Sequence, residues 1–159
     1  TSGREGTDSM RDTEAGEFTH EIRVGWGHCD PARIAYTGHI PGWALEAIDA
    51  WWEAHLDGDG WFEMEIDRGY GTPFVHLSMD FLSPITPRHR LVCAVWPVRL
   101  GETSISFRVI GSQDGQRCFS GLFVSVFMRA GAFRAVPAPD EARALVEALI
   151  RPDIPDARG

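Results

Sequence analysis

The sequence predicts an α+β fold in which an antiparallel sheet of about five strands wraps around one long central helix. Two observations carry this prediction. One segment in the first third of the chain has apolar residues at the helical period, and the chain after residue 71 consists of apolar strand patterns separated by turn signals. The expected order is one strand, the long helix and then four strands, which is typical of an antiparallel α+β domain.

The central helix is expected over residues 37–55 and is the longest helix that the pattern predicts. Its apolar residues recur at i, i+3, i+4, i+7, i+8 and i+11, and they are Ile40, Trp43, Ala44, Ala47, Ile48, Trp51 and Trp52. The Gly- and Asp-rich run 56–60 ends the helix, and residues 61–68 are expected to form a short helix. A strand is expected over residues 18–26, with Phe18, Ile22, Val24 and Trp26 on one face.

The later strands are expected at residues 73–82, 90–99, 103–110 and 116–129. Pro97 lacks a backbone N–H donor and indicates a sheet edge or a bulge, while Asp114-Gly115 is a hairpin turn signal. A last helix is expected at about residues 139–150. A sheet that covers one helix leaves open strand edges and an apolar face around Trp96, so we expect a homodimer or a homotetramer.

Length and composition define the class of molecule. A chain of 159 residues with 43% hydrophobic residues is the size of one domain with a core. We expect a mobile N-terminal tail at 1–16, a single domain at 17–151 and a C-terminal tail at 152–159. The net charge of −8 argues against nucleic-acid binding. The three cysteines suggest neither a disulfide frame nor a metal site. No apolar run reaches membrane-spanning length and no signal peptide is visible, which favours a cytoplasmic protein.

Two short motifs point to a function. The first is His28-Cys29-Asp30-Pro31-Ala32, just before the long helix, and the second is Gly71-Thr72-Pro73 at the start of the next strand. With the order of strands, they resemble the hotdog-fold acyl-CoA thioesterases, most closely the 4-hydroxybenzoyl-CoA thioesterase type, over roughly residues 18–150. The resemblance implies a hotdog fold, a homo-oligomer with active sites at a subunit interface, and no metal or organic cofactor beyond the coenzyme A of the substrate.

Thioester hydrolysis needs hydrogen-bond donors that polarise the carbonyl oxygen and a base or nucleophile beside the carbonyl carbon. Free N–H groups at a helix start provide the first, and we expect Thr37 and Gly38 to donate them. The carboxylate of Asp30 is the candidate nucleophile or general base. Asp before Pro also commonly caps a turn, so a structural role is the alternative for Asp30.

Substrate contacts are expected at Thr72, by resemblance, and at Trp43, although packing in the core is the plainer role for that indole. The hydroxybenzoyl enzymes carry a basic cluster at a strand turn where this chain, by resemblance, has only Arg99. Coenzyme A is therefore expected at Arg33, Arg88 or Arg90, or the carrier is an acyl carrier protein. Aromatic and medium-chain acyl groups are both open.

Several alternatives compete with this assignment. Cys29 is a possible thiol nucleophile. Glu46 and Asp49 are the second choice of carboxylates, by resemblance to a related hotdog branch that uses an acid on the central helix. The run from Gly38 to Gly42 looks like a motif of hotdog hydroxyacyl dehydratases, in which His39 would be catalytic. A non-catalytic acyl-CoA-binding protein is the remaining class. The carboxylate of Asp30 before the helix argues against it, because a protein that only binds needs no base there.

Overall fold

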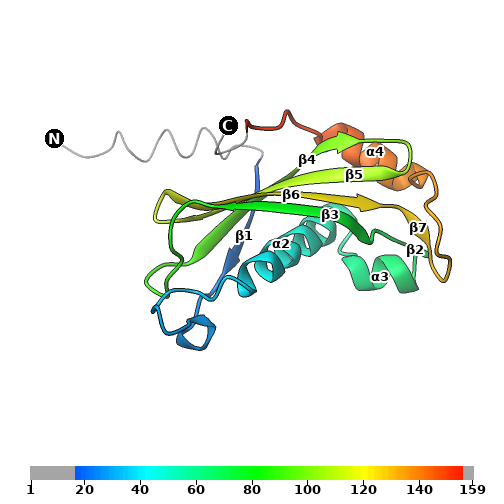
Figure 1. Cartoon of the computed structure of the whole chain (residues 1–159). Helices are drawn as coiled ribbons and strands as arrows, with labels where there is room; N and C mark the ends of the chain where they lie inside the picture. The colour runs from blue at the N-terminus through cyan, green and yellow to red at the C-terminus, as the bar shows by residue number, and fades with distance from the viewer. Residues whose placement is uncertain (1–16, 156–159) are drawn as a thin grey trace.

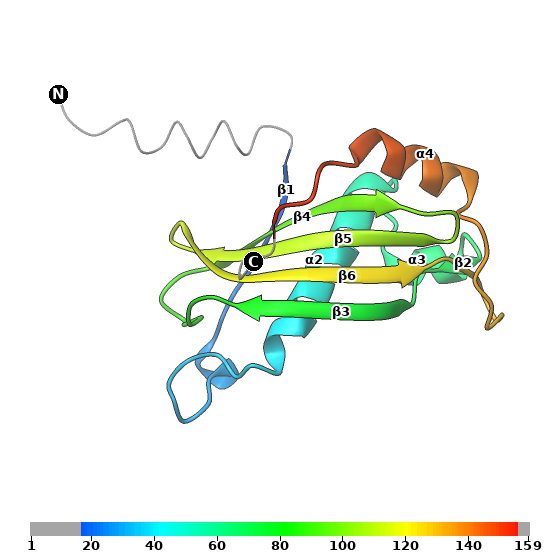
Figure 2. The same cartoon turned by 45° about the horizontal axis from the view of Figure 1, so that its top comes forward.

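The computed structural model describes residues 17–155. Its centre is a five-stranded antiparallel sheet in the order β1-β4-β5-β6-β3. The strands are β1 (Phe18–Ile22), β3 (Phe74–Phe81), β4 (Leu91–Leu100), β5 (Ser104–Gln113) and β6 (Gln116–Val126). Figures 1 and 2 show the long helix α2 (His39–His55) across one face of this sheet. The predicted architecture, an antiparallel sheet around one central helix, is confirmed.

The core lies between α2 and the inner face of the sheet. The seven apolar residues that defined the helical period are all buried, and Trp51 packs edge-on against Phe107 of β5 at 5.0 Å between ring centroids. The helix begins at His39, two residues later than expected, because His39 and Ile40 donate their N–H groups to the carbonyls of Tyr36 and Thr37 in turn-like bonds. Trp51 and Trp52 are therefore core residues.

The short helix α3 (Trp61–Ile66) follows α2 as expected and ends two residues early. Its first N–H group, on Trp61, donates to Oδ1 of Asp49 at 2.7 Å, so a carboxylate from α2 caps the start of α3. Gly60 is required beside this contact, since a Cβ there would meet Oδ1 of Asp49 at 2.6 Å. The bond between Trp61 and Asp49 fixes α3 against α2.

The first strand ends at Ile22, four residues earlier than predicted. A 3-10 turn, η1 (Trp26–His28), replaces its last part, and the indole of Trp26 is 75% exposed. The expectation that Trp26 continues the buried face is therefore wrong. The cause is local, because the N–H of Gly25 donates to Nδ1 of His28 at 2.9 Å and turns the chain before a further strand residue can pair.

The remaining strands follow the turn signals closely. Asp114 and Gly115 both have positive φ angles, 50° and 78°, and they join β5 to β6 in a tight hairpin. The register of β4 against β5 shifts between Pro97 and Arg99, which is the predicted bulge. The strand expected over 116–129 is wrong at its end: β6 stops at Val126, and β7 (Met128–Arg129) pairs with β2 (Tyr70–Gly71) in a separate two-stranded sheet.

The outer face of the sheet is covered near β4 by the C-terminal part of the chain. Helix α4 (Asp140–Leu149) contacts β4, and the segment after it crosses the sheet, where Nε1 of Trp96 donates to the carbonyl of Pro152 at 3.2 Å. Trp96 is only 6% exposed, so the expected open apolar face around it is wrong. Arg108 of β5 forms a bidentate ion pair with Asp153 at 2.7 and 2.8 Å. The tail expected at 1–16 and the last four residues of the tail expected at 152–159 lie outside the described residues.

Candidate active site

The motif around Asp30 forms a small hairpin-like loop between η1 and α2. Backbone bonds join Tyr36 to His28 at 2.9 Å and Asp30 to Ile34 at 3.0 Å, with Cys29 and Ala35 paired between them. The N–H of Ala35 also donates to the carbonyl of Ile85, in the segment after β3. The loop is therefore held at the end of the sheet where β3 finishes, and it returns the chain to the start of α2.

Asp30 is half-buried in this loop and keeps one carboxylate oxygen available. Its Oδ1 accepts the N–H of Ala32 at 2.8 Å, the Asx-turn bond expected of an Asp before Pro. Within residues 17–155, no other hydrogen bond or ion pair reaches the carboxylate. The structural role considered for Asp30 is thus present, and it uses only one of the two carboxylate oxygens.

The start of α2 offers unpaired backbone donors on the same segment that carries Asp30. Among the described residues, the N–H groups of Thr37 and Gly38 have no acceptor, both residues are exposed, and no acidic side chain lies in the first turn. Thr37 follows Tyr36, which pairs with His28, so the ladder places Asp30 within about 10 Å of it. A helix of 17 residues adds its positive dipole end at this point.

An aromatic cluster supports the wall of the loop. His28 lies edge-on to His39 and to Trp43, each at 5.2 Å between ring centroids, while His39 stacks on Trp43 at 5.9 Å. Trp43 is 8% exposed and belongs to the core, although its exposed neighbour His39 borders the loop. Because His28 accepts a bond through Nδ1, its proton resides on Nε2 in the neutral form.

The predicted coenzyme A residues are brought together only in part. Arg88 and Arg90 line a cavity of about 270 Å³ next to the loop, together with Arg23 and Trp26, which the sequence reasoning did not single out as binding residues. Arg33 does not line this cavity and is exposed on the Asp30 loop with a φ of 67°. That angle lies in the left-handed region, which favours glycine over a residue with a side chain.

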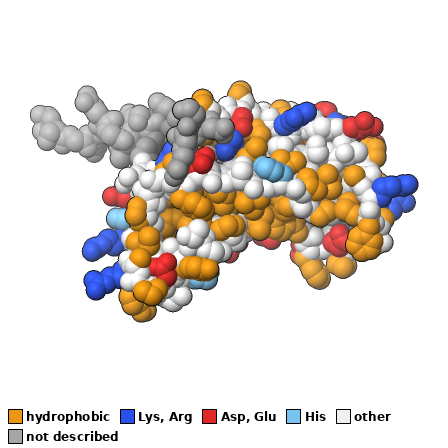
Figure 3. Space-filling view, viewed as in Figure 1, with side chains coloured by type: hydrophobic (Ala, Val, Ile, Leu, Met, Phe, Trp, Pro, Cys, Tyr) orange, Lys and Arg blue, Asp and Glu red, His pale blue; other side chains and the backbone are white. Residues whose placement is uncertain are grey.

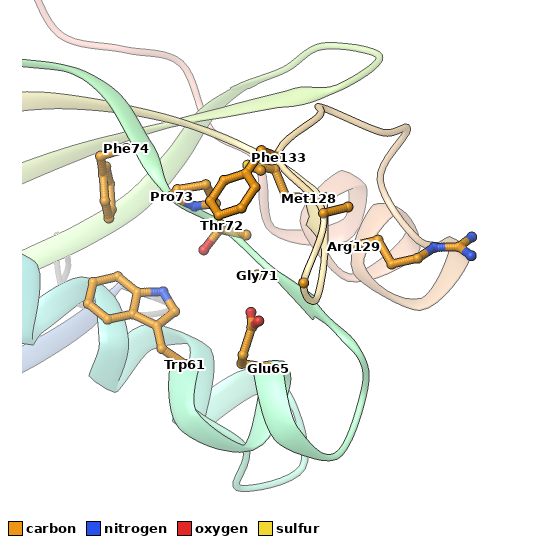
Figure 4. A pocket seen from close by; sticks show the side chains of 11 residues that line it. Trp61, Glu65, Gly71, Thr72, Pro73, Phe74, Met128, Arg129 and Phe133 are labelled. Carbon is orange, nitrogen blue, oxygen red and sulfur yellow. The ribbon is translucent and has the colours of Figure 1, made fainter.

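Thr72 lies at the opposite end of the same protomer. It lines a cavity of about 620 Å³ between α3, the start of β3 and β7, whose apolar walls include Trp61, Phe74 and Phe133 (Figure 4). Strand β3 separates this cavity from the Asp30 loop, and its eight residues span about 26 Å. One protomer therefore does not bring Thr72 and Asp30 together.

Two buried polar atoms of this second cavity lack partners. They are Oγ1 of Thr72 and Nε1 of Trp61, both closed off from solvent within the protomer. Each unmet group costs about 1–3 kcal/mol when no partner is supplied. Figure 4 shows both side chains reaching into the space between α3 and the start of β3. Sequence reasoning missed Trp61, and its place opposite Gly-Thr-Pro was visible only in the fold.

The alternative nucleophiles have other roles. Glu46 accepts a bond from Nε2 of His20 at 2.7 Å on an exposed face, and Asp49 caps α3. Burial raises the pKa of Cys93 to about 12, so that thiol stays protonated. Cys29 is half-buried and its Sγ lies 3.9 Å from the carbonyl of Gly25.

The described part of the chain offers neither a metal site nor a membrane span. Residues 17–155 contain no group of three or more His, Cys, Asp or Glu side chains placed to hold a metal ion. Over the same range, no helix combines the length and the apolar character needed to cross a membrane.

Comparison with known proteins identifies the family of this α+β fold. The chain belongs to the thioesterase-like superfamily, whose family model matches residues 24–146. The hotdog fold and the enzyme class expected from the sequence, thioester hydrolase, are those of this family. No curated protein matches the chain.

Solved structures show the same fold. A thioesterase-superfamily protein from Jannaschia sp. CCS1 is 57% identical, with a TM-score of 0.84 over 86% of this chain and 95% of that one. A 1,4-dihydroxy-2-naphthoyl-CoA thioesterase from Synechocystis is 20% identical, with a TM-score of 0.72 over 82% and 95%. A thioesterase from Thermus thermophilus, complexed with coenzyme A and Zn, is 20% identical, with a TM-score of 0.69 over 84% and 93%.

Proposed function

We propose that this protein hydrolyses the thioester of an acyl-CoA that carries an aromatic or medium-chain acyl group, by chemistry of the 4-hydroxybenzoyl-CoA thioesterase type. One observation carries the proposal: a carboxylate oxygen of Asp30 has no partner among the described residues, and the same short segment ends in the unpaired N–H groups of Thr37 and Gly38. These N–H groups donate to the carbonyl oxygen and stabilise the negative charge that develops on it. Family membership and the thioesterases among the neighbours support the reaction class.

Asp30 then acts in one of two ways. As a nucleophile, its carboxylate attacks the thioester carbon, the carbon–sulfur bond breaks, and the thiolate of coenzyme A leaves. Water then cleaves the acyl-aspartyl anhydride to release the acid. As a general base, Asp30 takes a proton from water, which attacks the same carbon directly. Both routes end in a carboxylic acid and free thiol, and both need the charge of Asp30.

We further propose that the complete site forms between two subunits. Strand β3 is a sheet edge that exposes Val75, Leu77 and Phe81 at 62%, 42% and 40%. Figure 3 shows hydrophobic side chains gathered along this side of the molecule. Antiparallel pairing of β3 with its copy about a two-fold axis places the beginning of one strand beside the end of the other.

This pairing brings together the Asp30 loop and the Thr72 cavity, which lie at opposite ends of one protomer. Ala35 ties the Asp30 loop to Ile85, at the end of β3, whereas Thr72 and Phe74 lie at its beginning. A two-fold axis through β3 therefore sets the Thr72 cavity of one protomer against the Asp30 loop of the other. The apolar walls of the Thr72 cavity fit the acyl group, because about 620 Å³ is the size of a small-ligand site.

The test is a panel of acyl-CoA esters with release of free thiol followed continuously. The panel pairs benzoyl with hydroxylated aromatic groups and with aliphatic chains of increasing length. We expect turnover of at least one ester to exceed its spontaneous hydrolysis by several orders of magnitude. Tight binding of the esters without any thiol release would reject the enzyme and favour the acyl-CoA-binding alternative.

A further inference from the structure

The cavity next to the Asp30 loop, lined by Arg23, Trp26, Arg88 and Arg90, is built from two segments far apart in the sequence. Residues 23–26, from the end of β1 to the first residue of η1, form one wall, and residues 87–90, just before β4, form the other. The cavity holds about 270 Å³. It borders the same chain segment that carries Asp30, four residues after Trp26.

The cavity is cationic in an acidic protein. Arg23, Arg88 and Arg90 line it, no Asp or Glu does, and none of the three guanidinium groups has a carboxylate partner in residues 17–155. His89, a further lining residue, has its Nε2 3.9 Å from the carboxylate of Asp114. Guanidinium groups bind phosphate through paired hydrogen bonds, so the three arginines suit a ligand with several phosphates.

The cavity also presents a flat aromatic surface. The indole of Trp26 is 75% exposed, and it lies between Gly25 and Gly27, which have no side chains to cover it. An exposed indole beside three arginines has the composition of a nucleotide site, since purine rings stack on aromatic faces while the cations bind the phosphates.

We propose that this cavity binds the 3′-phosphoadenosine diphosphate end of an acyl-CoA, with adenine against Trp26 and the phosphates on Arg23, Arg88 and Arg90. The proposal rests on the thioesterase function and adds the carrier. Coenzyme A and an acyl carrier protein share the phosphopantetheine arm, but only coenzyme A brings a purine. The exposed indole is therefore a reason to expect coenzyme A.

An alternative place for the nucleotide is disfavoured by the contacts there. The turn between β4 and β5 carries one arginine of its own, Arg99. A second arginine, Arg143 of α4, reaches this turn, but its guanidinium already donates to the carbonyls of Gly101 and Glu102 at 3.1 and 3.0 Å and lies 3.7 Å from the carboxylate of Glu147. Coenzyme A carries several phosphate charges, and the cavity at Trp26 offers three arginines without a carboxylate partner among the described residues.

The experiment measures binding of adenosine 3′,5′-bisphosphate and of pantetheine 4′-phosphate by calorimetry. We expect the nucleotide to bind, Trp26→Ala to weaken it by about tenfold, and Arg88→Gln with Arg90→Gln to weaken it by more than about tenfold and to reduce its salt dependence. Pantetheine 4′-phosphate, which lacks the purine, should not respond to Trp26→Ala. Arg99→Gln is the matched control and should leave nucleotide binding unchanged.

The outcomes separate this proposal from the proposed reaction. Nucleotide binding that falls in Arg99→Gln but not in Trp26→Ala would overturn the assignment and place the nucleotide at the β4–β5 turn. Hydrolysis of an acyl-pantetheine ester without any nucleotide binding would also overturn it, while the thioesterase function would stand. Nucleotide binding with no hydrolysis of any ester would support this site and reject the reaction. Preferred hydrolysis of an acyl carrier protein ester, unaffected by Trp26→Ala, would identify that protein as the carrier and overturn the proposal.

Discussion

The ion pair between Arg108 and Asp153 offers a quantitative test of how the outer face of the sheet is closed. Arg108 is buried, with its side chain 5% exposed, and its guanidinium donates to both carboxylate oxygens of Asp153 and to Oγ of Ser120. Asp153→Asn keeps the shape and one acceptor but removes the charge. A hydrogen bond to a charged group contributes about 1.5–3 kcal/mol. Asp153 is itself 36% exposed, so solvent screening reduces this to about 1–2 kcal/mol.

The same ion pair predicts a pH dependence with a defined sign. The hydrogen bonds from Arg108 hold the pKa of Asp153 below its usual value of 3.8. A carboxyl group whose pKa is lower in the folded state stabilises the fold above its unfolded pKa, and this stabilisation is lost as the pH falls through the folded pKa. The difference in unfolding free energy between the parent and Asp153→Asn should therefore stay constant from about pH 8 to about pH 5 and shrink below about pH 4.

The assay is urea and thermal unfolding of both proteins across this pH range. At about pH 7, Asp153→Asn should lower the melting temperature by about 3–6 °C. Glu147→Gln is the matched control, because its pair with Arg143 spans 3.7 Å and its side chain is 61% exposed, so it should change stability by less than about 0.5 kcal/mol. Equal effects of the two substitutions, or a difference that grows toward about pH 3, would refute the reasoning.

Three further predictions follow from other parts of the fold. Light scattering at micromolar concentration should give a dimer or tetramer, and Val75→Lys on the exposed edge should weaken it; a monomeric parent protein would reject the shared active site. Thr72→Val should change acyl selectivity or turnover while the fold persists, and kinetics identical to the parent across several acyl groups would leave Thr72 a purely structural role. Arg33 has a positive φ, which residues with a side chain disfavour and glycine accepts, so Arg33→Gly should leave the melting temperature unchanged or raise it. A clear fall would show that the side chain of Arg33 makes a contact that stabilises the loop.

The elements that the sequence predicted best are those fixed by local periodicity and turn chemistry. All seven apolar positions of α2 are buried because a single face of a helix must meet the sheet. The hairpin at Asp114 and Gly115 follows from residues that accept positive φ. The prediction that Trp26 continues the first strand was wrong for a local reason. The alternation of apolar residues fitted a strand, but the hydrogen bond from Gly25 to His28 turns the chain before Trp26 can pair.

Long-range pairings are where sequence reasoning stopped. The contacts of Trp96 with Pro152 and of Arg108 with Asp153 join positions 56 and 45 residues apart. Nothing in the local sequence around Trp96 or Arg108 indicates these partners. The site was predictable only to the extent that its motif is local: Asp30, Thr37 and Gly38 belong to one short segment before α2, and their catalytic role stays a prediction. The placement of Thr72 at the far end of β3 and the gathering of Arg23 and Trp26 with Arg88 and Arg90 needed the fold.

The measurement that tests the account most directly is the turnover of Asp30→Asn on the best acyl-CoA ester, taken together with its melting temperature. Asparagine keeps the Asx-turn acceptor for Ala32 while it removes the charge, so the loop should persist. The account predicts that kcat falls by at least about 100-fold, or about 2.7 kcal/mol in activation free energy, with a much smaller change in KM. Near-normal activity per folded molecule, with a lower melting temperature, would contradict it and assign Asp30 to the turn alone.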